Sequence, residues 1–315
     1  MSNKKLVDYI ITLYDNQDKD YPYRLRALNI ILGSIPTNIN VIIVEQMKSN
    51  QKRTYTENLK RFKNVNFISK KFDGYFNKSW LYNIGAKNAI TNTLLFAESD
   101  NFQEPLYYKN ILDYHIRHKH LKWFICWDQL IYLGKNDNIV EKVVKNPKTH
   151  GYAEGGLILF RKEFFYKIGG YNEWYECLGG MDNDISWRAD VLSNQFVHMP
   201  GTIYHYWHPK SSLKGSYDKE HNIIRKRNID TYNNLRKNKN FSILLQQYST
   251  KIGGDEPLCV KLKNPLLVGI NDMKNQTEIP QKQNETKKLN NVNSYNNIES
   301  PNKINIKPFK KLEFK

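Results

Sequence analysis

The chain has 315 residues, 40% of them hydrophobic, and carries a formal net charge of +17. Its length suits one large α/β domain or two smaller ones. The three cysteines, Cys126, Cys177 and Cys259, fit neither a zinc site nor a disulfide framework, which is usual for a reducing compartment. No run approaches the roughly 20 apolar residues of a membrane span, and the apolar N-terminal run is too short for a signal peptide. We therefore expect a soluble, cytoplasmic protein.

Apolar runs and helical spacings alternate along the first hundred residues. Apolar residues at helical spacing predict a helix over 23–35, with Gly33 as a stop. A second helix is expected over 79–90, with Ser79 as its candidate N-cap. This alternation predicts an α/β fold with a doubly wound, mostly parallel sheet, which binds ligands beyond the carboxyl ends of its strands. The predicted strands are 6–13, 40–46, 64–69 and 93–102.

The later part of the chain changes in character. Two more strands are predicted at 123–127 and 157–160, and a basic, exposed helix from about residue 218. We assign 1–250 to the α/β domain and 251–275 to a peripheral extension. Residues 276–315 are rich in Asn, Lys, Gln and Glu and hold too few large apolar residues to offset their ordering entropy, so we expect a disordered tail there.

The basic charge has two interpretations. Clustered Lys and Arg would bind nucleic acid by releasing counterions from phosphates. The lysines of this chain are scattered, often beside Asn, which favours a solvated surface. An anionic small substrate, such as a sugar nucleotide, needs only a local basic patch. We expect no nucleic-acid partner and keep nucleic-acid binding as an alternative that a steep salt dependence would reveal.

Two stretches offer candidate metal ligands. FAESDNF, at 96–102, ends a predicted strand on Glu98 and Asp100, whose side chains share one face because a strand repeats every two residues. Such a carboxylate pair suits Mn²⁺ or Mg²⁺, although acids in a loop can also cap a following helix. YHYWHP, at 204–209, holds His205 and His208, which could complete a metal site or be structural.

The stretch LGGMDNDISWRA, at 178–189, gathers acidic side chains behind two glycines. Asp182 stands where a helix is expected to begin. A carboxylate at that place can simply interact with the helix dipole. The functional interpretation is a general base that takes the proton from an acceptor hydroxyl. Asp184, on the same stretch, would orient the acceptor or cap the helix.

Three blocks together resemble a known family. FNKSWLYNIGAKNA, LLFAESDNF and the run from EGGLILF to LGGMDNDISWRA look like glycosyltransferases of the GT-A fold, in the group of the β-1,4-galactosyltransferases and chondroitin-polymerase-type enzymes. The likeness covers roughly 5–210. It implies a GT-A-like doubly wound mixed sheet with flanking helices and a divalent cation, Mn²⁺ or Mg²⁺. It also implies inverting transfer of a hexose or amino-hexose from a UDP-linked donor to a glycan or other hydroxyl acceptor.

The resemblance carries the family's functional residues onto this chain one at a time. It implies that Asp100 binds the metal and that Asp182 is the base. The metal-binding histidine falls best on His205, with His208 second. Glu98 stands in place of the family's first Asp, and Met181 in place of a Glu.

The resemblance also implies a donor site, and it leaves one alternative open. The implied donor-site residues are Arg24, Glu45, Trp80, Asn83, Glu98 and Gly156. The altered Glu98 and Met181 favour the alternative, a catalytically inactive module that binds a nucleotide sugar or a glycan. Hydrolysis of UDP-sugars with and without Mn²⁺ would separate the two.

Overall fold

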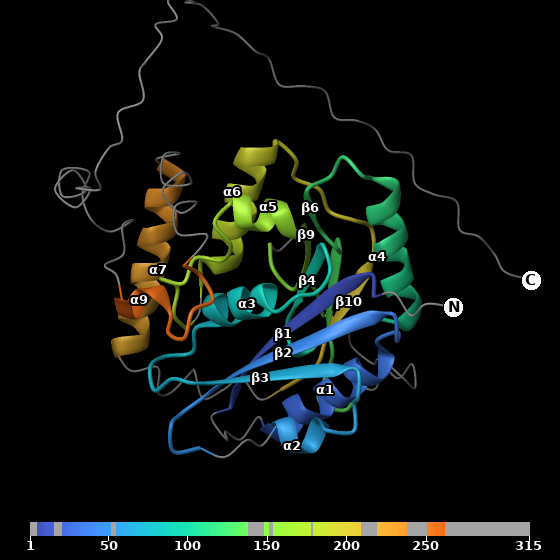
Figure 1. Cartoon of the computed structure of the whole chain (residues 1–315), viewed down its shortest axis with the longest axis horizontal. Coiled ribbons are helices and arrows are strands. Elements are labelled where there is room, and N and C mark those ends of the chain that lie inside the picture. Colours follow the sequence, from blue (N-terminus) through green and yellow to red (C-terminus); the bar gives the residue numbers. More distant parts are fainter. Residues whose placement is uncertain are drawn as a thin grey trace, which may run out of the picture. The chain divides into compact units, whose positions relative to one another are not determined.

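A six-stranded mixed sheet forms the centre of the described structure (Figure 1), which is a computed structural model. Its strand order is β3-β2-β1-β4-β9-β6, with the first four strands parallel and β9 antiparallel to both of its neighbours. A second, four-stranded sheet has the order β5-β10-β7-β8. The strands are β1 Val7–Asp15, β2 Ile39–Met47, β3 Val65–Lys71, β4 Thr93–Ala97, β5 Asn101–Phe102, β6 Trp123–Ile125, β7 Gln129–Tyr132, β8 Lys148–His150, β9 Leu157–Arg161 and β10 Thr202–His205.

Helices connect most of these strands and pack on the sheet. The helices are α1 Tyr21–Ser34, α2 Tyr55–Leu59, α3 Lys78–Lys87, α4 Pro105–Arg117, α5 Lys162–Lys167, α6 Met181–Ser193, α7 Lys219–Lys237 and α9 Leu258–Lys261. The structure describes residues 5–15, 21–51, 55–137, 148–150, 154–177, 179–208, 219–237 and 251–261. The α/β class, with a central mixed sheet and flanking helices, is confirmed.

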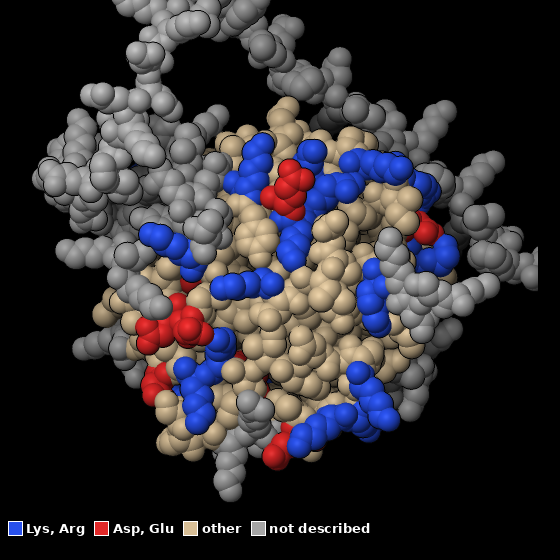
Figure 2. All heavy atoms as spheres, viewed as in Figure 1, with Lys and Arg blue, Asp and Glu red and all other residues tan. Residues whose placement is uncertain are grey.

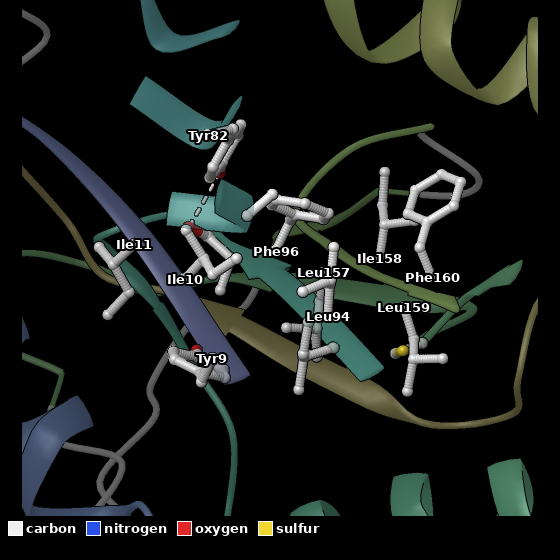
Figure 3. Packing of buried hydrophobic residues seen from close by; sticks show 14 of the residues in the cluster. Tyr9, Ile10, Ile11, Tyr82, Leu94, Phe96, Leu157, Ile158, Leu159 and Phe160 are labelled. Atoms are coloured by element: carbon white, nitrogen blue, oxygen red, sulfur yellow. Dashed lines mark hydrogen bonds between the residues drawn. The ribbon is translucent and has the colours of Figure 1, made fainter. Parts of the chain in front are cut away.

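The central strands are buried because helices cover both faces of the sheet. Every residue of β4 is buried, and every residue of β2 except Asn40. Such strands read as nearly continuous apolar runs, which is why the sequence located them. In Figure 3, Phe96, Ile158 and Phe160 point to one side of the sheet, whereas Tyr9 and Leu159 point to the other.

Aromatic contacts attach the helices to these two faces. On one face, Phe96 of β4 packs against Tyr82 of α3 and Phe165 of α5, with ring centroids 5.1 and 5.0 Å away. On the other face, Tyr9 of β1 packs edge-on against Tyr108 of α4 at 5.7 Å. This double covering buries the strands up to their carboxyl ends, where the candidate site lies.

The structure corrects three local predictions. Helix α3 begins one residue earlier than predicted, and its N-cap is Asn77 rather than Ser79, because the Asn77 side chain accepts the Trp80 N–H over 2.9 Å. Gly33 lies inside α1 instead of ending it. The predicted strand over 93–102 is two strands, because residues 98–100 form the turn between β4 and β5.

Residues 251–261, the described part of the predicted peripheral extension, pack into the core. Ile252 is buried, and the Trp80 indole N–H donates to the Gly254 carbonyl over 2.9 Å. The buried Glu173 carboxylate accepts the backbone N–H groups of Gly253 and Leu258 over 2.7 and 3.0 Å. This segment therefore stabilises the domain. The predicted tail, 276–315, lies outside the described residues.

Charge on the surface is divided among several groups. Figure 2 shows Lys and Arg in separate groups around the face in view, with largely uncharged surface between them. None of the described helices combines the length and the apolar character that crossing a bilayer requires.

Candidate active site

Asp100 lies in the turn that joins the two sheets. Asn101 of β5 pairs with His205 at the end of β10, and the Tyr206 N–H donates to the Asp100 carbonyl over 2.8 Å. This antiparallel register brings a histidine from late in the chain next to a carboxylate at the end of β4.

Asp100, His205 and His208 form a candidate metal site. His205 Nε2 lies 3.7 Å from Asp100 Oδ1, and His208 Nε2 lies 3.4 Å from Oδ2. One potential ligand atom from each of the three residues lies within 4.8 Å of the other two. Asp100 Oδ1 is buried and accepts no hydrogen bond from any described residue. A buried carboxylate oxygen beside two imidazoles fits a divalent cation.

The charge state of Asp100 suits such a site. Burial acts to raise the pKa of Asp100, but His205, His208 and Arg24 together lower it well below its usual range. The Arg24 guanidinium donates to Asp100 Oδ2 over 3.1 Å from helix α1. The carboxylate is therefore ionised, and Arg24, which the resemblance implied at the donor site, is in contact with it.

A second cluster is centred on Lys78, the first residue of α3. Its Nζ atom lies 2.6 Å from Glu98 Oε1 and 3.9 Å from Asp182 Oδ2, and its side chain is 14% exposed. The Tyr82 ring lies 5.4 Å from the same atom. Burial acts to lower the pKa of Lys78, but Asp182 and Glu98 raise it well above its ordinary value. Lys78 is thus a cation shared by two carboxylates from distant segments.

Asp182 is the second residue of α6 and remains 28% exposed at its side chain. Burial raises its pKa to about 6, with Glu98 and Glu154 adding to the rise and Lys78 opposing it. Gly155 lies against it, since a Cβ added there would be 2.8 Å from Asp182 Oδ2. The result is an accessible carboxylate that is ionised at neutral pH yet basic enough to accept a proton.

Gly180, the second of the two glycines before Asp182, lies in a crowded place. Gly180, the N-cap of α6, has φ +82°, a left-handed conformation that favours glycine. A Cβ at this position would be 2.9 Å from the Tyr175 ring and 3.2 Å from the Asn228 carbonyl oxygen. Glycine is therefore required to start α6 under these neighbours, and the helix start fixes the Asp182 carboxylate.

Asp184, in contrast, is fully buried. Its carboxylate accepts hydrogen bonds from Arg188 Nε over 3.2 Å and Nη2 over 2.9 Å, and neither side chain is exposed. Arg188 also donates to the Ile168 carbonyl over 2.5 Å. The structure thus places Asp184 in an internal ion pair that anchors α6.

Three residues that the resemblance implied at the donor site are also buried and bonded within the core. Glu45 accepts from Thr56 Oγ1 over 3.1 Å and from Ser69 Oγ over 3.3 Å. Asn83 holds the loop before α6 by donating to the Tyr171 carbonyl and to Glu173 Oε1, each over 2.8 Å. Trp80 carries the contact to Gly254 described above. These side chains support the site without reaching its surface.

Gly156, directly before β9, is hydrogen-bonded to the turn that follows β4. Its carbonyl accepts the Glu98 N–H over 3.2 Å and Asn101 Nδ2 over 3.3 Å, and its φ is +89°. A Cβ at Gly156 would be 3.1 Å from Asn101 Nδ2 and from the Ile203 side chain. It shapes the turn that carries Glu98 and Asp100.

The sequence-based interpretation missed Lys78 and Glu154. Lys78 stands in the FNKSWLYNIGA block, directly before the residues that were singled out there. Glu154 accepts a hydrogen bond from Asn183 and lies close enough to Asp182 to raise its pKa. No spacing rule links either residue to Asp182, because the contacts form between separate elements.

A small cavity lies beside Trp207. Lys135 Nζ lies 5.6 Å from the Trp207 ring centroid, and the buried Tyr206 hydroxyl has no hydrogen bond to a described residue. The lining residues are Tyr23, Arg26, Ala27, Gly134, Lys135, Asp137, Tyr206 and Trp207.

Of the comparisons with known proteins, only the one with solved structures finds similar proteins. No protein-family model matches the chain, and no curated protein matches it. Staphylococcus aureus TarS 1–349 in complex with UDP-GlcNAc has 14% identity and a TM-score of 0.49, over 73% of this chain and 66% of that one. GalNAc-T7 with UDP, GalNAc and Mn²⁺ has 13% identity and a TM-score of 0.49, over 74% and 51%.

A third structure is the mannosyltransferase PcManGT from Pyrobaculum calidifontis in complex with GDP-Man and Mn²⁺. It has 13% identity and a TM-score of 0.48, over 78% of this chain and 70% of that one. This chain therefore spans about half to two thirds of the length of the TarS and GalNAc-T7 structures. At these identities and scores, the chemistry of the site rests on its own residues.

Proposed function

We propose that this chain is a metal-dependent glycosyltransferase that moves a hexose or amino-hexose from a UDP-sugar to a hydroxyl acceptor with inversion. One observation carries the proposal. A part-exposed carboxylate with a pKa of about 6, Asp182, starts a helix and shares Lys78 with the turn that holds the Asp100–His205–His208 cluster. A candidate base and a candidate cation site therefore flank one turn.

Asp182 is the general base in this proposal. Its carboxylate takes the proton of the acceptor hydroxyl while the acceptor oxygen forms a bond to C1 of the donor sugar. The bond between C1 and the diphosphate oxygen breaks, and UDP leaves with the electron pair. Attack from the face opposite the leaving group inverts C1, and no covalent enzyme intermediate forms. A base with a pKa near 6 is ionised at pH 7 and still accepts a proton well.

Asp100, His205 and His208 would hold the divalent cation. When bound, such a cation neutralises the charge that develops on the departing diphosphate. The donor set favours Mn²⁺ over Mg²⁺, because imidazole is a common ligand of transition metals whereas Mg²⁺ prefers oxygen. Arg24, hydrogen-bonded to Asp100, would bring a further positive charge toward the diphosphate.

The finer family assignment rests on sequence. Two sequence blocks, Gly179 to Asp182 and FNKSW, support the β-1,4-galactosyltransferase and chondroitin-polymerase-type group. The buried Asp184 is compatible with a role in folding. Glu98 and Gly156 lie at the same turn and are the remaining candidates for donor contact.

Release of UDP from a panel of UDP-sugars tests the function. We expect Mn²⁺-dependent release with at least one donor, abolished by a chelator. Asp182→Asn should lower turnover by at least about 100-fold while the affinity for UDP with Mn²⁺ changes little. Asp230→Asn, an exposed change on α7, is the matched control. Tight UDP binding with no turnover of any donor would instead favour the inactive binding module.

A further inference from the structure

We infer that Lys78 is a positioning residue for the base: its ammonium group, held between Glu98 and Asp182, fixes the Asp182 carboxylate next to the turn at the end of β4. The inference rests on the proposed function. Lys78 belongs to neither the base nor the metal cluster, yet it is the one described side chain that the structure places in ion pairs with both Glu98 and Asp182.

The backbone beneath Lys78 is held firmly. Asn77, the N-cap of α3, donates its N–H to Gln46 Oε1 over 2.9 Å and its Nδ2 to the Glu173 carbonyl over 2.7 Å. Tyr82, one turn along α3, donates its hydroxyl to the Ala97 carbonyl at the end of β4 over 2.9 Å. The start of α3 is thus attached to β2, to β4 and to the loop before α6, so the backbone that carries Lys78 is fixed.

The two ion pairs differ in the distance between Lys78 Nζ and the carboxylate oxygen, which shows how Lys78 acts. The contact with Glu98 is a hydrogen bond of 2.6 Å, whereas the 3.9 Å contact with Asp182 is electrostatic. Asp182 is therefore attracted toward Lys78 without its basic oxygen accepting a short hydrogen bond from the ammonium group. This leaves the carboxylate able to accept a proton from a substrate.

The charged and titratable groups around Asp182 come from four other segments. Lys78 and Tyr82 lie on α3, Glu98 after β4, Glu154 before β9, and Tyr171 before α6. The tyrosines stay neutral because burial raises their pKa values further. Lys78 is then the cation that offsets the two neighbouring carboxylates, and its removal should make Asp182 harder to ionise.

The pH dependence of kcat/KM in the full chain, with the best UDP-sugar and Mn²⁺, tests this role. The wild type should lose activity on the acid side with an apparent pKa of about 6. Lys78→Met should move this acid limb of the pH profile to higher pH by about one unit, whereas Lys78→Arg should leave it close to the wild-type position. Lys109→Met, which removes an exposed lysine paired with Asp113, is the matched control and should leave the limb in place.

Glu98→Gln supplies the opposite test. This change removes a negative charge that repels the Asp182 carboxylate, and Lys78 then has Asp182 as its remaining ion-pair partner. The pKa of Asp182 should therefore fall, and the acid limb of the pH profile should move to lower pH. A residue that only stabilises the fold would not shift the limb in opposite directions in the two variants. If Lys78→Met does not fold, the direction in which Glu98→Gln moves the acid limb still tests the role of Lys78.

The outcomes separate this inference from the function on which it rests. An acid limb that neither Lys78→Met nor Glu98→Gln moves would overturn the positioning role while leaving Asp182 as the base. A fully active Asp182→Asn would instead overturn the proposed mechanism, whatever Lys78 does.

Discussion

Gly155 lies in direct contact with Asp182, so that a Cβ added to Gly155 would be 2.8 Å from Asp182 Oδ2 and 2.9 Å from its carboxyl carbon. Real Cβ atoms essentially never come this close, and the flexible Asp182 side chain is the part that must move. Gly155→Ala should therefore displace the carboxylate while the backbone remains in place.

We expect Gly155→Ala to lower turnover by about 10-fold or more, because a base displaced by about 1 Å loses its alignment with the acceptor. The affinity for UDP with Mn²⁺ should stay within about twofold, since Asp100 and the histidines are untouched. Steady-state kinetics and calorimetry measure the two. Gly33→Ala, with nothing within 4 Å of the added Cβ, is the control. Normal turnover in Gly155→Ala would contradict the placement of Asp182.

Asp100→Ala should abolish the binding of UDP that depends on Mn²⁺ and leave the domain folded. The contacts of this carboxylate are with Arg24 and the two histidines, whose side chains are part-exposed, so its loss removes few core interactions. Calorimetric titration of UDP with Mn²⁺, next to a thermal melt, checks both halves. Asp113→Ala, on the exposed face of α4, should change neither. Affinity like that of the wild type in Asp100→Ala would remove Asp100 from the metal site.

Asp184→Asn should behave in the opposite way to Asp182→Asn. It leaves the fully buried Arg188 without a compensating charge, and breaking a buried pair costs about 3–5 kcal/mol. We expect a clear fall in melting temperature, with turnover of the remaining folded protein reduced far less than in Asp182→Asn. If Asp184→Asn were fully stable but inactive, the roles of the two carboxylates would have to be exchanged.

His115 should make stability depend on pH. Burial, assisted by Arg161, lowers its pKa to about 4, and its Nε2 lies 3.3 Å from Thr93 Oγ1. Between pH 6.5 and 4 the unfolded chain binds the proton and the folded chain does not, so stability falls as the pH falls through this window. The loss attributable to His115 is on the order of 3 kcal/mol.

Urea unfolding across this pH range tests the assignment. His115→Gln should flatten the acid loss of stability, whereas His120→Gln, at an exposed position, should not. An unchanged pH dependence in His115→Gln would show that another group is responsible.

Two truncations should differ in effect. Removal of 276–315 is expected to leave the melting temperature and UDP release nearly unchanged, because that stretch has few core-forming residues. Removal from residue 251 should lower the melting temperature by several degrees, since the buried Glu173 carboxylate loses the N–H groups of Gly253 and Leu258. Thermal melts of both truncated chains measure the difference. Equal melting temperatures would mean that 251–261 adds no stability.

The sequence by itself located most of the elements. Continuous apolar runs predicted β1, β2 and β4 because strands covered on both faces need apolar side chains at every position. It also placed Asp182 at a helix start, since glycines and acidic residues mark such boundaries locally, but it put Asp100 in a strand although Asp100 lies in the turn after β4. It failed at the N-cap of α3, where Ser79 and Asn77 are both suitable residues and only the fold shows that Asn77 accepts the Trp80 N–H.

Tertiary structure decided what each of these side chains can do. Asp182 and Asp184 are two residues apart and look alike in sequence, yet one is part-exposed beside Lys78 and the other is buried against Arg188. The pairing of β5 with β10 brought both His205 and His208 to Asp100, a contact that no local spacing encodes. The sequence specifies which groups can ionise, but burial and charges from distant segments set their pKa values and their access to a substrate, and those exist only in the folded chain.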